Sequence, residues 1–219
     1  MLRFAFPLAA ALFGASISGA AALPVTENYS YKGVFAQDNS IVLVDFTVAS
    51  ATTVTLRTYS YNGGTMADGT VIAAGGFDPI LSLFDSAGAL IDYNDDIDSF
   101  NGMWDVRLEV ALAAGDYTVA ISQYDNQVIG GDLANGWAFD EDPWFTDAEY
   151  GCMTGQFCDA DNDSRTSAWA FDVLNVTVAT VVDDGNGGGS ASAVPLPAAA
   201  PLMGAALGLL GFAARRRRG

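Results

Sequence analysis

Side chains with carboxylate or amide oxygens gather in two short stretches of the sequence. The first stretch, DYNDDID at residues 92–98, carries Asp92, Asn94, Asp95, Asp96 and Asp98. The second stretch, DADNDS at residues 159–164, has acids at alternate positions, Asp159, Asp161 and Asp163. Calcium takes roughly six to eight such oxygen ligands in proteins. Each stretch is therefore a candidate calcium site, and the alternative is a solvated turn, because Asn and Asp favour turns.

The second stretch opens like an EF-hand loop but does not continue as one. Ser164 stands where the glycine of the sharp turn belongs, and Ala170 stands where the bidentate glutamate is expected. If calcium binds there, we expect an irregular site.

The chain contains no histidine. This excludes Ser-His-Asp and Cys-His catalysis in their usual forms, HExxH metalloprotease sites and histidine-ligated zinc. Glycoside hydrolysis needs only two carboxylates, and residues 137–149 interleave acids with aromatic rings: Trp137, Asp140, Glu141, Asp142, Trp144, Phe145, Asp147 and Glu149. An acidic loop whose tryptophans pack onto the domain explains this pattern more simply. We therefore expect no enzyme.

Cys152 and Cys158 are the two cysteines of the chain. In an exported protein such a pair indicates a disulfide that closes a small loop. A reactive thiol or a metal pair is the alternative, although two thiolates without a third soft ligand make a poor zinc site.

In the segments that must position these groups, apolar and polar residues alternate with a period of two. In WDVRLEVAL the apolar residues Val106, Leu108, Val110 and Leu112 alternate with polar ones, which is typical of a half-buried strand. A short AAGD link and a strand carrying Tyr117, Val119 and Ile121 follow, which predicts an antiparallel hairpin. We expect further strands at residues 41–48, 53–59, 70–74, 79–84, 89–93 and 168–180, and no helix that competes with them.

About eight short strands separated by Gly, Asn and Asp predict an all-β fold, an antiparallel, jelly-roll-like β-sandwich over residues 23–181. Residues 123–165 break the strand pattern and form a long acidic loop insertion. The segment VDDGNGGGSAS then indicates a flexible linker over residues 182–193.

Both ends of the chain indicate export. Residues 1–22 carry Arg3, an apolar stretch and small residues, which is typical of a signal peptide cleaved between Ala22 and Leu23. Near the other end, residues 194–214 are uncharged, and at ~1.5 Å per residue a helix of this length crosses a hydrocarbon core of ~30 Å. By the positive-inside rule, the arginines that follow stay in the cytoplasm and the body lies outside.

The body between these ends is strongly acidic. It holds all 26 acidic residues of the chain but only four of the 9 basic ones, namely Lys32, Arg57, Arg107 and Arg165. Its net charge is therefore about −22. Such a charge repels nucleic acid and anionic lipid surfaces. We therefore expect no nucleic-acid partner. The apolar content of 51% excludes disorder as the explanation of the acidity.

The C-terminal segment resembles the VPLPA variant of the PEP-CTERM sorting signals. The resemblance covers residues 194–219, in which the motif precedes an apolar helix and an arginine cluster: Val194, Pro195, Leu196, Pro197, Ala198, Arg215, Arg216, Arg217 and Arg218. It implies processing by a membrane-embedded exosortase, transient attachment to the inner membrane and delivery to the cell surface. A plain membrane anchor is the alternative.

A second resemblance covers roughly residues 40–124. It rests on the following residues: Phe77, Asp78, Leu81, Leu83, Asp85, Gly88, Asn94, Asp95, Asp96, Gly115 and Tyr117. With these residues the segment is similar to the bacterial pre-peptidase C-terminal domain, a jelly-roll sandwich. The resemblance implies an accessory module that binds or associates with a matrix.

These observations together lead us to expect a non-enzymatic, exported surface or extracellular-matrix protein associated with exopolysaccharide. A calcium-dependent carbohydrate-binding module is the alternative, and a glycoside hydrolase is the third.

Overall fold

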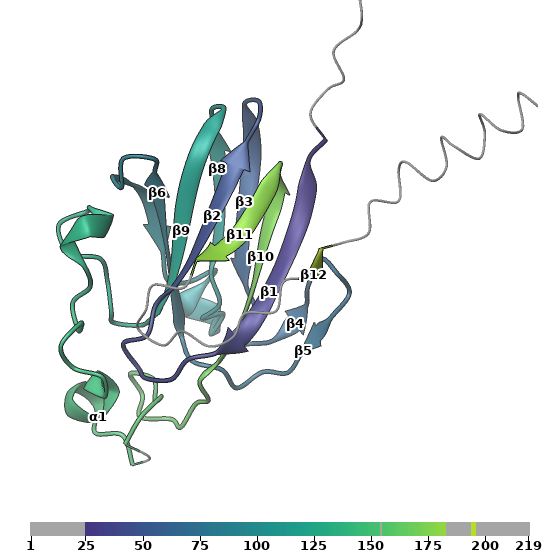
Figure 1. The fold of residues 1–219 in the computed structure, drawn as a ribbon. Coiled ribbons are helices and arrows are strands. Elements are labelled where there is room, and N and C mark those ends of the chain that lie inside the picture. The colour runs from purple at the N-terminus through teal and green to yellow at the C-terminus, as the bar shows by residue number, and fades with distance from the viewer. Residues whose placement is uncertain (1–24, 154, 183–193, 196–219) are drawn as a thin grey trace, which may run out of the picture.

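The computed structural model describes residues 25–153, 155–182 and 194–195 (Figure 1). The expected signal peptide with Ala22 and Leu23, the linker residues 183–193 and the sorting segment from Leu196 onward lie outside these ranges. Among the residues within them, no helix is long and apolar enough to cross a membrane.

Two antiparallel sheets contain most of the described residues (Figure 1). Sheet A has the order β12 (Val194–Pro195), β1 (Glu27–Val34), β10 (Ala168–Val176), β3 (Thr52–Thr58) and β8 (Arg107–Leu112). Sheet B has the order β11 (Val178–Val182), β2 (Val42–Val48), β9 (Gly115–Gln123), β6 (Pro79–Asp85) and β7 (Leu90–Asn94). The predicted all-β, antiparallel class is confirmed.

The main core lies between the two sheets because alternate residues of each strand point inward. Sheet A contributes Val54, Leu56 and Phe171, and sheet B contributes Val44 and Val119, all nearly fully buried in one apolar cluster. The two sheets therefore pack face to face as a sandwich.

The predicted hairpin between residues 105–112 and 117–122 is wrong. β8 pairs with β3 in sheet A, whereas β9 pairs with β2 and β6 in sheet B. The inward residues Leu108 and Val119 belong to the same core. A short link can join strands of facing sheets as well as neighbours in one sheet, and here both apolar faces are buried when the strands face each other.

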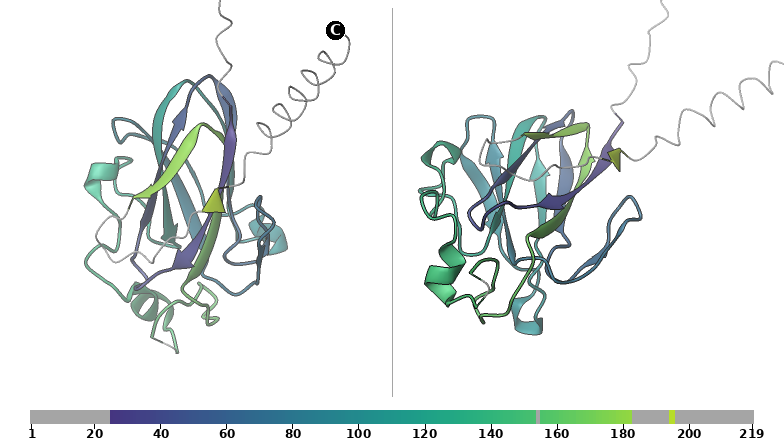
Figure 2. Two further views of the ribbon diagram at one scale, coloured as in Figure 1. Left: turned by 45° about the vertical axis from the view of Figure 1, so that its right-hand side comes forward. Right: turned by 60° about the horizontal axis from the view of Figure 1, so that its bottom comes forward.

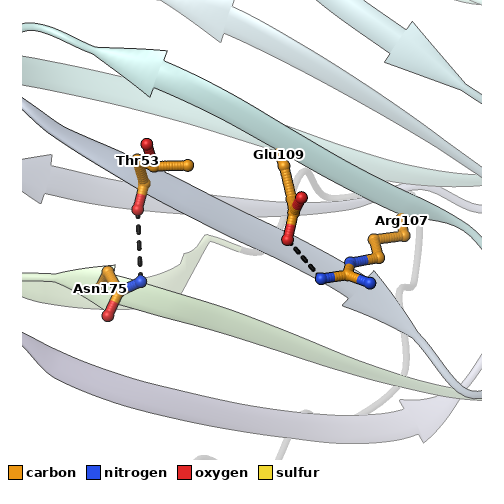
Figure 3. Close-up of polar contacts among 4 residues, drawn as sticks. All are labelled: Thr53, Arg107, Glu109 and Asn175. Atoms are coloured by element: carbon orange, nitrogen blue, oxygen red, sulfur yellow. Dashed lines mark hydrogen bonds and ion pairs between the residues drawn. The ribbon is translucent and has the colours of Figure 1, made fainter.

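The single strand predicted at residues 168–180 is two strands. β10 lies in sheet A and β11 in sheet B, with the chain passing between the sheets at Thr177. Asn175 has a φ of 66° at the end of β10, and its side-chain amide donates to the carbonyl of Thr53 at 3.3 Å (Figure 3). This backbone turn, together with its side-chain bond, redirects the chain.

Several elements were not predicted from the sequence. β1 supplies an outer strand of sheet A, and the insertion contains the 3₁₀ helix η2 (Leu133–Asn135) and the helix α1 (Phe145–Tyr150). A further 3₁₀ turn, η1 (Ser99–Asn101), follows β7. The strand expected at residues 70–74 is short, and it pairs as β5 (Val71–Ile72) with β4 (Gly64–Thr65).

The excursion, residues 124–167 between β9 and β10, covers the outer face of sheet B and runs past one end of the sandwich (Figures 1 and 2). Trp137 packs there with Ile41 and Phe84 in a second apolar cluster. The buried carboxylate of Asp38 accepts bonds from the Thr146 hydroxyl and, at 2.9 Å, from the Phe157 amide. The insertion is therefore a packed part of the domain.

A disulfide bond joins Cys152 and Cys158, whose Cα atoms are 5.8 Å apart. Both cysteines are buried, and the Cys158 carbonyl accepts a bond from the Gln123 side chain at 3.3 Å. The disulfide therefore closes a small loop directly before the second acidic stretch, and the hydrogen bond from Gln123 ties this loop to the end of β9.

Candidate functional site: an acidic pocket at one end of the sandwich

Antiparallel pairing brings six strand ends, and the three connections that join them, to the same end of the molecule. The chain leaves β3, β7 and β9 at this end, and it enters β6, β8 and β10 there. The two acidic stretches follow β7 and precede β10, so the topology places them together.

These connections line a pocket of about 250 Å³, here called the acidic pocket. Its lining residues are Tyr61, Asp78, Asp95, Asp96, Trp104, Tyr124, Asp159, Ala160 and Asp161. Five carboxylates and three aromatic rings thus share one hollow. Asp78 and Asp159 are buried, Asp95 and Asp96 are half-buried, and Asp161 is exposed.

The pocket joins parts of both predicted calcium clusters and leaves other parts out. Asp95 and Asp96 come from the first stretch, and Asp159 and Asp161 come from the second. The remaining predicted ligands do not line it: Asp92, Asn94, Asp98 and Asp163. The two clusters, predicted as separate sites, therefore meet in one hollow.

Some of these oxygens are occupied by local hydrogen bonds. The Asp159 carboxylate accepts from the backbone amide of Asp163 at 2.9 Å and from the Tyr61 hydroxyl at 2.8 Å. Asp98 accepts from the backbone and side chain of Asn101 in the η1 turn. These hydrogen bonds stabilise the loops that contain Asp159 and Asp98.

Asp78 differs from the other carboxylates of the pocket. Its side chain is only 8% exposed, and its Oδ1 atom is buried without a hydrogen-bond partner. A buried acceptor without a partner costs free energy that water or a ligand would otherwise recover. Asp78 lines the pocket from the residue before β6, so its carboxyl group borders the hollow.

Burial and mutual repulsion raise the pKa values of two of these groups. Desolvation, with Asp96 and Asp95 nearby, raises the pKa of Asp78 to about 8. Desolvation and Asp95 raise the pKa of Asp96 to about 6. Both shifts have the sign expected of carboxyl groups that are buried beside other acids.

Basic side chains do not neutralise the pocket. Among the described residues the one ion pair joins Arg107 to Glu109 on sheet A (Figure 3). Arg165 lies nearer the pocket, with its guanidinium carbon 3.4 Å from the Tyr61 ring centroid, but its donors bond to the carbonyls of Gly76 and Tyr61. The Arg165 side chain therefore supports the Tyr61 wall without pairing with an acid.

The fit of the pocket to a metal ion is partial. Carboxylate oxygens are the ligands that calcium prefers, and the pocket offers several from different loops. Within the described part of the chain, however, no three acidic or cysteine side chains are grouped closely enough to hold a metal ion.

The acidic and aromatic residues at 137–149 do not form a sugar platform together. Trp137 and Phe145 are buried, and the Phe145 ring stacks on Phe139 with centroids 4.2 Å apart. Asp140 accepts a bond from the backbone amide of Trp137 at 2.9 Å, and Asp142 accepts one from that of Trp144. Of the three aromatic residues Trp137, Trp144 and Phe145, Trp144 alone is exposed.

Two larger hollows have less chemistry to offer. One of about 530 Å³ lies beside β1, β10 and β5, and its lining includes Gly33, Ile72, Ala168 and Trp169 but no carboxylate. Another of about 490 Å³ includes Asp45 and Asp116, but each of these carboxylates accepts a hydroxyl bond, from Thr118 and Thr47 respectively. We therefore place the candidate site at the acidic pocket.

Sequence reasoning did not assign four of the acidic and aromatic lining residues to a site: Tyr61, Asp78, Trp104 and Tyr124. Each lies within a few residues of a strand end. A position near a strand end points to a shared site only when the strand pairing shows which strand ends lie together.

Comparisons of the chain with protein-family models, with curated protein sequences and with solved structures gave no match.

Proposed function

We propose that the protein is a non-enzymatic, exported binding module that is processed by exosortase and acts at the cell surface or in the extracellular matrix, in association with exopolysaccharide. The jelly-roll resemblance and the VPLPA segment belong to this proposal. The observation that supports binding most is the acidic pocket, in which carboxylates and aromatic rings converge on loops of a packed sandwich. Loops held by a rigid scaffold are common binding sites.

The pocket favours binding over hydrolysis. A glycosidase needs one carboxylate as acid and another as base or nucleophile, on opposite sides of a bond. Asp159 accepts bonds from Tyr61 and from its own loop, which suits a structural role better than proton transfer.

The sorting part of the proposal is tested by the intact mass of native protein recovered from the cell surface. We expect mature protein to lack the residues after about Ala198, and a Pro195→Ala, Pro197→Ala variant to remain uncut in the membrane. Native surface protein that still carries Arg215, Arg216, Arg217 and Arg218 would contradict exosortase processing and favour a plain anchor.

A second candidate is a calcium-dependent carbohydrate-binding module. It is favoured by the meeting of Asp95 and Asp96 with Asp159 and Asp161 in one pocket. In metal-stripped protein we then expect calcium to raise the melting temperature by several degrees. At a hundredfold excess over Kd, preferential binding to the native state stabilises by about 2.7 kcal/mol.

Magnesium should have less effect than calcium, because it gives up its waters reluctantly. Asp95→Asn with Asp96→Asn, or Asp161→Asn alone, should each remove most of the shift, because one pocket uses both loops. An equal melting temperature with calcium and with chelator would reject this candidate.

A further inference from the structure

We propose that the acidic pocket binds the ammonium group of an amino sugar, so that the polymer this protein associates with is a cationic, deacetylated amino-sugar polymer. This inference rests on the proposed association with polysaccharide and names the class of polymer.

The first argument is the imbalance of charge in the pocket. Five carboxylates line it, and the nearest guanidinium, that of Arg165, is bonded to backbone carbonyls. An ammonium group carries one positive charge and three donors. It can therefore neutralise charge and satisfy the unpartnered Oδ1 of Asp78 at once.

The second argument is the aromatic part of the lining. Tyr61 and Trp104 meet edge to face with centroids 6.3 Å apart, and Tyr124 lines the same hollow. A metal ion with oxygen ligands gains little from such walls. An organic cation gains from them, because aromatic faces attract cations and pack against the apolar parts of a ring.

The size of the pocket and the spacing of its acids also favour an organic cation. Its 250 Å³ equals the volume of roughly eight waters, which suits a sugar ring better than a bare ion. Among the described residues, no three acidic or cysteine side chains are grouped tightly enough for a metal. An ammonium group does not require such a cage, because its hydrogen bonds can reach separate carboxylates.

The net charge of the whole body also favours a cationic polymer. A net charge of about −22 repels anionic polymers and attracts cationic ones at long range. Recognition at the pocket and steering by the surface thus favour the same class of partner.

The test compares two probes that differ only in charge. Binding of a β-1,4-linked glucosamine hexamer and of the N-acetylglucosamine hexamer is measured by calorimetry with the full mature protein, below neutral pH so that the amines are charged. We expect the glucosamine hexamer to bind about tenfold or more tightly than the acetylated one, because acetylation removes the charge-assisted hydrogen bonds.

Pocket variants locate the binding. Asp78→Asn, Asp96→Asn and Asp161→Asn should each weaken binding of the glucosamine hexamer about tenfold, since each replaces a carboxyl group that can ionise beside the ammonium group with a neutral amide. Asp116→Asn is the matched control, because it removes the same charge from the other acid-lined hollow. Its effect should stay within about twofold. If Asp78→Asn does not fold, Asp161→Asn carries the test, because the Asp161 side chain is exposed.

Three outcomes would overturn the inference: equal affinity for the two hexamers, an equal loss in Asp116→Asn, or calcium alone stabilising the stripped protein and displacing the hexamer. The last outcome would assign the pocket to a metal. Retention of the extracted cell-surface polysaccharide without preference for the charged hexamer would reject this inference but leave the proposed function in place. Binding to neither hexamer nor to that polysaccharide would reject both.

Discussion

At the scale of single residues, Asp78 carries most of the information about the site. Its carboxylate is buried at the start of β6, has an unsatisfied oxygen and faces four other acids across the acidic pocket. Asp105 is also buried, but both oxygens of its carboxylate have partners. They accept bonds from the Thr58 hydroxyl and from the backbone amides of Tyr61 and Asn62. Burial alone therefore does not mark a binding carboxylate, whereas burial without partners does.

The raised pKa of Asp78 predicts a dependence of stability on pH. In the unfolded chain its pKa is near 3.8, and in the native state it is about 8, so between these values the native state holds a proton that the unfolded state releases. Stability from this group is thus complete below the lower value and is lost as pH rises through the higher one, by at most about 1.4 kcal/mol per pH unit.

The Asp78→Asn variant lacks this ionisable group and therefore loses its contribution to the pH dependence of stability. We expect the free energy of unfolding of the natural protein to fall, relative to the variant, as pH is raised from about 4 to about 8. Urea unfolding of both proteins across this range measures the difference. Parallel pH profiles for the natural protein and for Asp78→Asn would show that the native carboxylate titrates normally.

Sequence reasoning reached some of these residues and missed others for a physical reason. Asp95, Asp96, Asp159 and Asp161 stand out because acids cluster locally. Asp78 stands alone among apolar neighbours, and its importance arises from contacts with residues distant in the chain. A single sequence contains no sign of such contacts until the strands are paired.

At the scale of elements, the alternating apolar pattern predicted most strands but not their partners. β2, β3, β6, β7 and β9 lie within a residue or two of the expected ranges. The assignment of β8 and β9 to different sheets was missed, because an inward apolar face looks the same in either sheet. The same ambiguity concealed the break between β10 and β11.

At the same scale, the disulfide closes a small loop of the excursion directly before the Asp159 residue that lines the pocket. Replacing Cys152 and Cys158 by serine should loosen residues 139–165 and spare the sandwich, with a loss of about 2 kcal/mol because the closed loop is short. Hydrogen exchange measures this by segment. Protection should fall in the excursion, including the Asp159 loop, and should persist in β2 and β9. An equal loss of protection in those core strands would mean that the bond supports the whole fold.

At the scale of the whole molecule, the described residues form a domain of two main sheets, with five acids lining a pocket at one end and the excursion packed along one side (Figure 2). The expected signal peptide and the sorting segment after Pro195 fall outside the described residues. Export and processing therefore stay predictions from the sequence, whereas the pocket is a property of the folded domain. We propose that the exported domain binds its polymer at the acidic pocket.

The most direct test of that claim is a crystal structure of the protein with the glucosamine hexamer bound. We predict one sugar ring in the acidic pocket, with its ammonium nitrogen within hydrogen-bond distance of Asp78 Oδ1 and its ring against Trp104 or Tyr124. A hexamer bound at another surface, with Asp78 Oδ1 still lacking a partner, would contradict the account.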